Sequence, residues 1–226
     1  MKSLLFSIFY CTFFLNSLFA QQDKIGLRLA LYSNNDFYDY DEFVVGSSHL
    51  SKSYYFDADV WIEVSASYLK RYKNHSIKAE INYQKTPYSI NEFSRGSNNH
   101  VIWKASHIDI PIGVKVHFEK LYTFIGIGTT FNFFNPVNEV QSSSLTPIEI
   151  RTLTNFSETI KSAHRRVNFF IDANTGVDFA HFSLELGGRL GLLPKIKIFD
   201  FQETTFHPYA IRSQLYFGVV FPIAIK

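Results

Sequence analysis

The 226-residue sequence contains almost no cysteine and has no excess of charge of either sign. Its single cysteine is Cys11, and 22 Lys and Arg side chains stand against 20 Asp and Glu side chains. One cysteine cannot close an internal disulfide or build a zinc site on several thiolates. The balanced charge gives no strong positive field of the kind that attracts nucleic acid. These absences argue against a disulfide scaffold, a cysteine-rich zinc protein and a nucleic-acid-binding domain.

A long apolar run occurs only near the N-terminus. Lys2 precedes the apolar run 4–14, and the small residue Ala20 follows it. This order is typical of a secretory signal peptide, so we expect residues 1–20 to be cleaved from a mature domain of residues 21–226. The run is short for a spanning helix and no basic stop-transfer cluster follows it, which makes a retained anchor the weaker interpretation. The single cysteine would leave with the signal peptide.

From Lys24 onward, short polar breaks separate runs in which every second residue is apolar. In the clearest run, residues 59–68, the apolar side chains fall on one face, and Asp, Glu and Ser side chains fall on the other. Because side chains alternate faces along a β-strand, this period predicts a sheet with one apolar and one polar face. Eight such runs occur, at residues 24–34, 58–72, 76–88, 104–118, 121–134, 166–180, 182–196 and 213–225. The mean hydropathy of −0.03 agrees with strands that are half polar.

The connections between these runs alternate in length. Three are tight turns, at residues 73–75, 119–120 and 180–181, and four are long and polar, at residues 35–57, 89–103, 135–165 and 197–212. Short turns at one end and long loops at the other are typical of an up-and-down outer-membrane barrel, with the turns in the periplasm. Within the third long connection, the stretch from Ser142 to Lys161 could hold a short helix.

Two eight-stranded barrels fit this pattern, and they differ in where the apolar face points. A soluble lipocalin-like barrel turns it inward around a ligand, whereas an outer-membrane barrel turns it outward into lipid. Large side chains such as Ile108, Ile110 and Ile112 fill the apolar faces, and an eight-stranded interior is only just wide enough for side chains. Glycines fall mostly on the polar face, as a narrow lumen requires: Gly113, Gly126, Gly128, Gly176, Gly187, Gly191 and Gly218. The sequence therefore predicts an all-β, eight-stranded antiparallel up-and-down transmembrane β-barrel in the outer membrane, with short periplasmic turns and long extracellular loops.

Aromatic residues fall near both ends of the predicted strands. Those beside the short turns or the C-terminus are Tyr72, Phe118, Tyr122, Phe179, Phe182 and Phe221. Those near the long loops are Tyr88, Trp103, Phe133, Phe134 and Phe169. Two such bands are expected at the two membrane interfaces.

One hairpin carries a more specific motif. Residues 107–118, HIDIPIGVKVHF, place an acidic residue, an apolar residue and proline before an inward lysine, and a tight turn and the glycine-rich strand 122–134 follow. In this motif and in overall layout the chain resembles the PorT-like outer-membrane barrel family of Bacteroidota. The resemblance implies the barrel fold and says little about activity, although one branch of that family serves protein secretion and gliding. Pro111 lacks an N–H and a closed barrel has no free edge, so we expect a local β-bulge there.

Charged residues recur on the predicted inward face. They are Arg28, Glu63, Lys78, Glu80, Asp109, Lys115, Asp172, Asp178, Glu185 and Arg189. Because buried charges must be paired, we expect them to form a charge network that plugs the lumen. The alternative is a pore or proton path, which is less favoured because an eight-stranded lumen is usually filled by side chains.

Histidines and serines supply only weak candidates for chemistry. His107 and His117 share the inward face, but ten residues at about 3.3 Å each separate them too far for one metal site. His107 is instead expected to pair with Asp109. We predict no metal site and no cofactor.

Two Ser–His pairs in the predicted loops are candidates for a lipid-modifying enzyme. They are Ser97 with His100, and Ser162 with His164. Neither pair has an acidic partner or a nucleophile-elbow motif, so we predict no catalytic residue.

The remaining candidates for function are the long loops. The acidic and aromatic stretch 36–42 and the sequence Tyr54-Tyr55-Phe56 could form an external binding surface. The leading hypothesis is a small, monomeric, non-enzymatic outer-membrane barrel with a structural or binding role, whose partners are outer-membrane lipid and other envelope proteins but not nucleic acid. Three alternatives are an accessory component of a secretion or gliding apparatus, a lipid-modifying outer-membrane enzyme and a soluble lipocalin-like ligand-binding barrel.

Overall fold

The computed structural model describes residues 23–34, 37–39, 43–45, 48–51, 61–72, 75–92, 99–137, 146–202, 204–207 and 209–224. Eight long strands form most of it: β1 (Asp23–Asn34), β5 (Trp61–Arg71), β6 (His75–Glu92), β7 (Asn99–Phe118), β8 (Leu121–Phe134), β9 (Val167–Asp178), β10 (Ser183–Gly191) and β14 (Ser213–Ala224). The described residues also include helix α2 (Pro147–Ala163) and six short strands: β2 (Phe37–Asp39), β3 (Phe43–Val45), β4 (Ser48–Ser51), β11 (Phe199–Phe201), β12 (Thr204–Phe206) and β13 (Tyr209–Ile211).

The eight long strands form one closed antiparallel barrel. Each pairs with its neighbours in chain order, and β14 returns to pair with β1, from Lys24 opposite Ala224 to Asn34 opposite Gln214. Closure satisfies the backbone N–H and C=O groups between strands and removes the free edges of the sheet, which a sheet in lipid requires. The predicted eight-stranded up-and-down barrel is confirmed.

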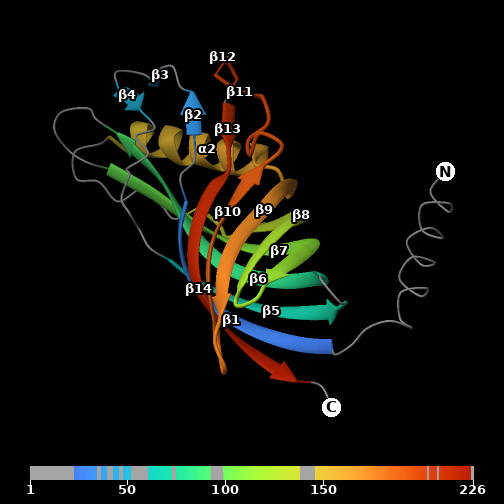
Figure 1. The fold of residues 1–226 in the computed structure, drawn as a ribbon. Coiled ribbons are helices and arrows are strands. Elements are labelled where there is room, and N and C mark those ends of the chain that lie inside the picture. Colours follow the sequence, from blue (N-terminus) through green and yellow to red (C-terminus); the bar gives the residue numbers. More distant parts are fainter. Residues whose placement is uncertain are drawn as a thin grey trace, which may run out of the picture.

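The two ends of the barrel differ as the connection lengths predicted. Tight turns join β5 to β6, β7 to β8 and β9 to β10 at one end, here called the turn end. Glu119 adopts a positive φ of 56° in the turn before β8. Helix α2 and the short strands lie at the opposite end, the loop end (Figure 1).

The strands differ from the sequence prediction in two places, the β6–β7 hairpin and the end of β10. The connection 89–103 was predicted as a long loop, but β6 and β7 remain paired as far as Glu92 opposite Asn99. This hairpin runs past the end of β8, where the strands need no apolar face and so carry no alternating pattern. In contrast, β10 ends at Gly191, before the predicted residue 196, because the chain then turns to pair with the C-terminal end of α2 through Lys197 N–H to Ala163 O, at 2.9 Å.

The β-bulge predicted at Pro111 is wrong. Pro111 lies opposite Gly128 of β8 in an unbroken register. On the other side, β6 and β7 are paired before and after Pro111 in the same register, from Ala79 opposite Ile112 to Asn82 opposite Asp109. The ladder is therefore interrupted for two residues without an inserted one, because the missing N–H faces β6.

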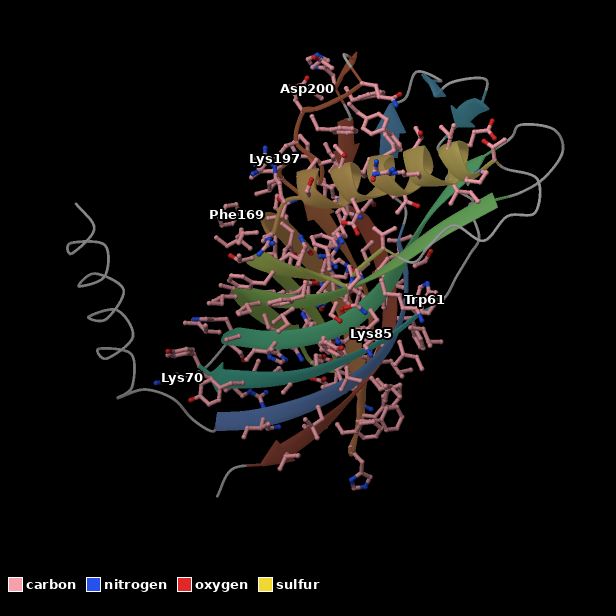
Figure 2. All side chains as sticks on the ribbon, turned by 180° about the vertical axis from the view of Figure 1, so that it is seen from behind. Trp61, Lys70, Lys85, Phe169, Lys197 and Asp200 are labelled. Carbon is pink, nitrogen blue, oxygen red and sulfur yellow. The ribbon has the colours of Figure 1, made fainter. Side chains whose placement is uncertain are left out.

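Side chains alternate along each long strand, and the apolar ones point out of the barrel. Outward positions are exposed, as at Ile127, which is 68% exposed, and inward positions such as Asp109 are fully buried. The outward surface is an apolar belt around the barrel. Figure 2 shows side chains projecting from the strands. A belt of this kind is stable against lipid chains and unstable in water.

The glycine pattern suggested a lumen lined mostly by small side chains, but large aromatic rings also fill it. Tyr32, Tyr122, Phe124, Phe170 and Tyr216 all point inward and are buried. Four of the seven inward glycines make room for these rings: Gly126, Gly128, Gly176 and Gly187. A Cβ added to Gly128 would lie 2.3 Å from the ring of Phe170, and one added to Gly187 would lie 2.6 Å from the ring of Tyr216.

Two residues assigned to the aromatic bands also point elsewhere. Tyr122 is buried in the lumen, and Phe134 packs against the cluster beneath α2. Phe118, Phe133 and Phe169 are exposed on the outer surface as expected. The side chains of Tyr88 and Trp103 lie outside the described residues.

Helix α2 lies across the loop end and is well formed by its own sequence (Figure 1). The Thr146 side chain accepts the N–H of Glu149, and the Glu149 carboxylate accepts the N–H of Thr146, which completes a capping box. Phe156, Ile160 and Ala163 recur at helical spacing on the buried face. They pack with residues of the barrel rim and of β11 and β12: Ala105, Ile196, Phe199, Phe201 and Phe206. None of the described helical residues forms a segment long and apolar enough to cross a membrane.

Several expectations fall on residues that lie outside the described part of the chain. They are the signal peptide 1–20, the sequence Tyr54-Tyr55-Phe56, most of the stretch 36–42, and Ser97.

Candidate functional site

All nine residues proposed for the lumen charge network lie inside the barrel and are buried. They are Arg28, Glu63, Lys78, Glu80, Asp109, Lys115, Asp172, Glu185 and Arg189. They come from six strands, and each occupies an inward position of the two-residue period. Eight of them form two connected clusters, one nearer the turn end of the barrel and one nearer the loop end.

The turn-side cluster consists of Arg28, Lys78, Glu80 and Glu185. Arg28 is 2.9 Å from Glu80 and 3.0 Å from Glu185. Lys78 bridges the same two carboxylates, at 3.0 Å and 3.2 Å. Two cations and two anions thus form a closed ring of ion pairs, and this balance is what makes four charged groups tolerable in a buried space.

The loop-side cluster consists of Glu63, Asp109, Asp172, Arg189 and Arg212. Arg189 lies at its centre and contacts Glu63, Asp109 at 3.2 Å and Asp172 at 3.2 Å. Arg212 holds Asp109 in a bidentate pair, with contacts of 3.0 Å and 2.8 Å. Planar guanidinium groups suit such paired contacts, since each presents several donors in a fixed fork.

Glu63 joins the two clusters into one network. Its Oε1 accepts from Arg28 Nη2 at 2.7 Å and from Arg189 Nη2 at 3.0 Å. The ring of Tyr216 lies beside both arginines, with its centroid 4.6 Å and 4.9 Å from their guanidinium carbons. The Tyr216 hydroxyl donates to Asp172 at 2.9 Å. The Tyr216 ring therefore adds cation–π contacts to the two guanidinium groups, and its hydroxyl adds a hydrogen bond to Asp172.

Lys115 is placed differently from the other eight residues. It is 3.8 Å from Asp178 and its ammonium lies 3.2 Å from the centroid of the Tyr122 ring. It lines a cavity of about 310 Å³ at the turn end, together with Lys24, Arg71 and His117. The lumen is thus open from the turn end as far as the turn-side cluster.

At the loop end the lumen is closed. Below α2, between His107, His164, Phe170 and Arg212, the remaining space has a volume of only about 10 Å³. That space holds one water molecule at most. The network fills the middle of the lumen, and α2 lies across its loop end.

Sequence reasoning missed several members of the network, three of which lie around Asp109. Arg212 was assigned to the loop before β14, and Gln84 and Gln214 were passed over because they are uncharged. Gln84 donates to Asp109 at 2.9 Å, and Gln214 donates to Gln84 at 2.7 Å. Extending the two-residue period of β14 by one step, from Gln214 back to Arg212, would have identified the arginine as an inward residue.

The histidines have ordinary partners. His107 forms its Nδ1 hydrogen bond with Asn132, the residue directly opposite on β8, while Asp109 is held by Arg212 and Gln84. His117 lies at the turn end, 3.2 Å from the Ser76 hydroxyl. No group of three or more His, Cys, Asp or Glu side chains within the described residues could hold a metal ion.

The Ser–His candidate that can be judged is not arranged for catalysis. The Ser162 hydroxyl is exposed on α2 and donates to the carbonyl of Thr159 at 2.7 Å. His164 is buried, with its Nδ1 2.9 Å from the Ile160 carbonyl and its ring against Phe134. For the other pair, Ser97 and the side chain of His100 lie outside the described residues.

Comparison with known proteins supports the same fold. The model of a family described as outer membrane protein beta-barrel domain matches residues 19–196. Among solved structures, the chain is similar to Neisserial surface protein A (NspA), with 9% identity, a TM-score of 0.43, and coverage of 89% of this chain and 97% of that one. It is also similar to OprG from Pseudomonas aeruginosa, with 7% identity, a TM-score of 0.46, and coverage of 92% and 98%. No curated protein matches the chain in sequence. Since the family match spans β1 to β10, the chain belongs to the family of outer-membrane proteins with a β-barrel domain, and its location is the outer membrane.

Proposed function

We propose that this protein is a non-conducting, non-enzymatic outer-membrane barrel that serves as a rigid base for a binding surface at its loop end. The observation that carries the proposal is the network of ion pairs from Arg28 to Arg212, which crosses the lumen between six strands and the start of β14. Each charge of the two clusters has an oppositely charged partner within the barrel. Opening a path for ions or solutes would separate these pairs, and an unpaired buried charge costs several kcal/mol.

The same network supports a structural role. It ties β1, β5, β6, β7, β9 and β10 together across the lumen, in addition to the backbone ladder. A barrel held rigid by this network would fix the position of α2 and the short strands at its loop end. Binding residues are commonly found on loops that a rigid scaffold positions.

The described part of the loop end includes the outer face of α2. Ile148 is 78% exposed near the start of the helix, and Arg151, Asn155 and Glu158 are exposed further along it. A large apolar residue among polar neighbours suits contact with another envelope protein. The motif at residues 107–118 supports a relation to the PorT-like barrels of Bacteroidota, in which one branch serves secretion and gliding.

Conductance in planar lipid bilayers tests the closed lumen. The full mature chain is expected to insert without conductance steps, while a large porin in the same bilayers gives them. The double variant Glu63→Ala/Arg189→Ala, which removes the central pair, is expected to increase ion leakage if it folds. Stable unitary conductance of the unchanged protein would overturn the proposal.

Cross-linking in cells tests the binding surface. A photo-reactive amino acid at Ile148 is expected to form a protein adduct of discrete mass, and the same amino acid at Leu186 on the apolar belt is expected to form none. Equal adducts at both positions, or none at Ile148, would contradict a role for the face of α2.

A further inference from the structure

Among the outward side chains that the structure describes, the barrel carries three lysines. Among the outward positions of the eight long strands whose side chains the structure describes, the only Lys, Arg, Asp or Glu residues are Lys70, Lys85 and Lys104. Lys70 lies near the turn end, where its register partner on β1 is Asp23, and Figure 2 shows Lys85 well separated from it. Lys85 and Lys104 lie on neighbouring strands toward the loop end. Their position and their common sign need an explanation.

The pairing of β6 with β7 places Lys85 and Lys104 close together. Lys85 lies opposite Ser106 of β7. Lys104 precedes Ser106 by two residues and therefore lies on the same face. Such diagonal neighbours have Cβ atoms about 7 Å apart. Both lysine side chains are exposed, and neither forms an ion pair with another described residue. Two adjacent ammonium groups repel each other unless an anion lies between them.

The surroundings of the two lysines match a lipid rather than a soluble anion. Toward the turn end, the next outward residues are Tyr83, which is 43% exposed, and Ile108. Phe133 of β8 pairs with Ser106 of β7 and is exposed on the same outer face. The hydroxyls of Tyr83 and Ser106 lie 3.4 Å apart beside the lysines. Positive charge and hydroxyl groups therefore lie directly above an apolar surface, as the headgroup and the chains of an anionic lipid require.

We propose that Lys85 and Lys104 bind the phosphate of a phosphorylated lipid in the outer leaflet, with its acyl chains along Tyr83, Ile108 and Phe133. The loop end faces outward from the cell, so the site lies in the outer leaflet. The phosphate removes the repulsion between the two ammonium groups. The fixed spacing of the two strands sets the distance between the two cations, and this spacing distinguishes the site from a single interfacial lysine such as Lys70.

Lipid titration in detergent tests the proposal directly. The purified, delipidated protein would be titrated in non-ionic micelles with diphosphoryl lipid A, and separately with its dephosphorylated form, using native mass spectrometry to count bound lipid. The wild-type protein is expected to bind the phosphorylated form in preference. The variant Lys85→Gln/Lys104→Gln is expected to bind it roughly ten- to thirtyfold more weakly, given the usual contribution of each lysine to anionic-lipid binding.

Lys70→Gln is the matched control, because it also removes one outward lysine from the belt. It is expected to bind lipid as tightly as the wild type, and the heat-modifiable gel shift of all variants is expected to be unchanged. An equal loss in Lys70→Gln would indicate a general charge effect and overturn the proposal. Unchanged binding in the double variant would overturn it as well. Displacement of the lipid by millimolar inorganic phosphate would assign the lysines to a soluble anion instead.

Discussion

Arg189 and Leu190 are adjacent on β10 and lie in opposite environments. Arg189 is fully buried and contacts carboxylates from three other strands, whereas Leu190 is 49% exposed on the apolar belt. On the inward face, each side chain is specified by partners that are distant in sequence. On the outward face, a side chain needs only to be apolar. The same strand therefore combines a face that tolerates almost no substitution with a face that tolerates many.

The largest expected effect of a single substitution is on the inward face. Arg189→Ala would leave Glu63, Asp109 and Asp172 short of a cation, and removing one partner of a buried ion pair typically costs about 3–5 kcal/mol. We expect the urea midpoint of unfolding in micelles, followed by the heat-modifiable gel shift, to fall accordingly. Leu190→Val is the control on the adjacent outward residue and should change stability by less than about 0.5 kcal/mol. Similar losses for both variants would remove the difference between the two faces.

The outward face should still reject charge at its centre. Ile127 lies in the middle of β8 and is among the most exposed apolar side chains. Ile127→Arg is expected to destabilise the barrel in a bilayer by about 2–4 kcal/mol, because the guanidinium would face hydrocarbon. Ile127→Leu should be neutral in the same refolding titration. If arginine were tolerated as well as leucine, the belt would not face lipid.

Two glycines of the inward face, Gly128 and Gly191, differ in the space that an added Cβ would have. A Cβ at Gly128 would lie 2.3 Å from the Phe170 ring, whereas one at Gly191 would meet its nearest atom at 3.4 Å. Gly128→Ala is therefore expected to cost about 1–3 kcal/mol through overpacking, and Gly191→Ala much less. Both variants can be measured by the same unfolding titration. Equal effects would show that the inward rings can move aside at little cost.

The strand pattern was predictable because a lipid-facing barrel imposes a strict two-residue period. All eight runs became strands, and the nine charged residues proposed for the lumen are inward and buried. The rest of the network was not predictable, since its pairs join distant strands. Nothing near Arg212 in sequence indicates that it holds Asp109 on β7. His107 and Asn132 likewise meet only through the register of β7 with β8.

The sequence pattern is misleading where the two-residue rule is relaxed. The hairpin of β6 and β7 continues to Glu92 and Asn99, although its sequence lacks alternation, because it extends past β8. Pro111 needed no bulge, since a two-residue gap in one ladder accommodates it. The glycines were correctly placed on the inward face, but four of the seven make room for buried rings. Pattern alone gives the face of a residue and not the neighbour that it meets.

Quenching of tryptophan fluorescence by lipids with brominated acyl chains tests most directly which face meets lipid. Trp61 packs on the inward side against Ala30, Tyr32 and Tyr216, and Trp103 would be replaced by Phe in all variants. In bilayers of brominated lipid, Trp61 is expected to be quenched weakly. A tryptophan at position 127, introduced as Ile127→Trp with Trp61→Phe, is expected to be quenched strongly. Strong quenching of Trp61 together with weak quenching at position 127 would contradict the outward direction of the apolar face.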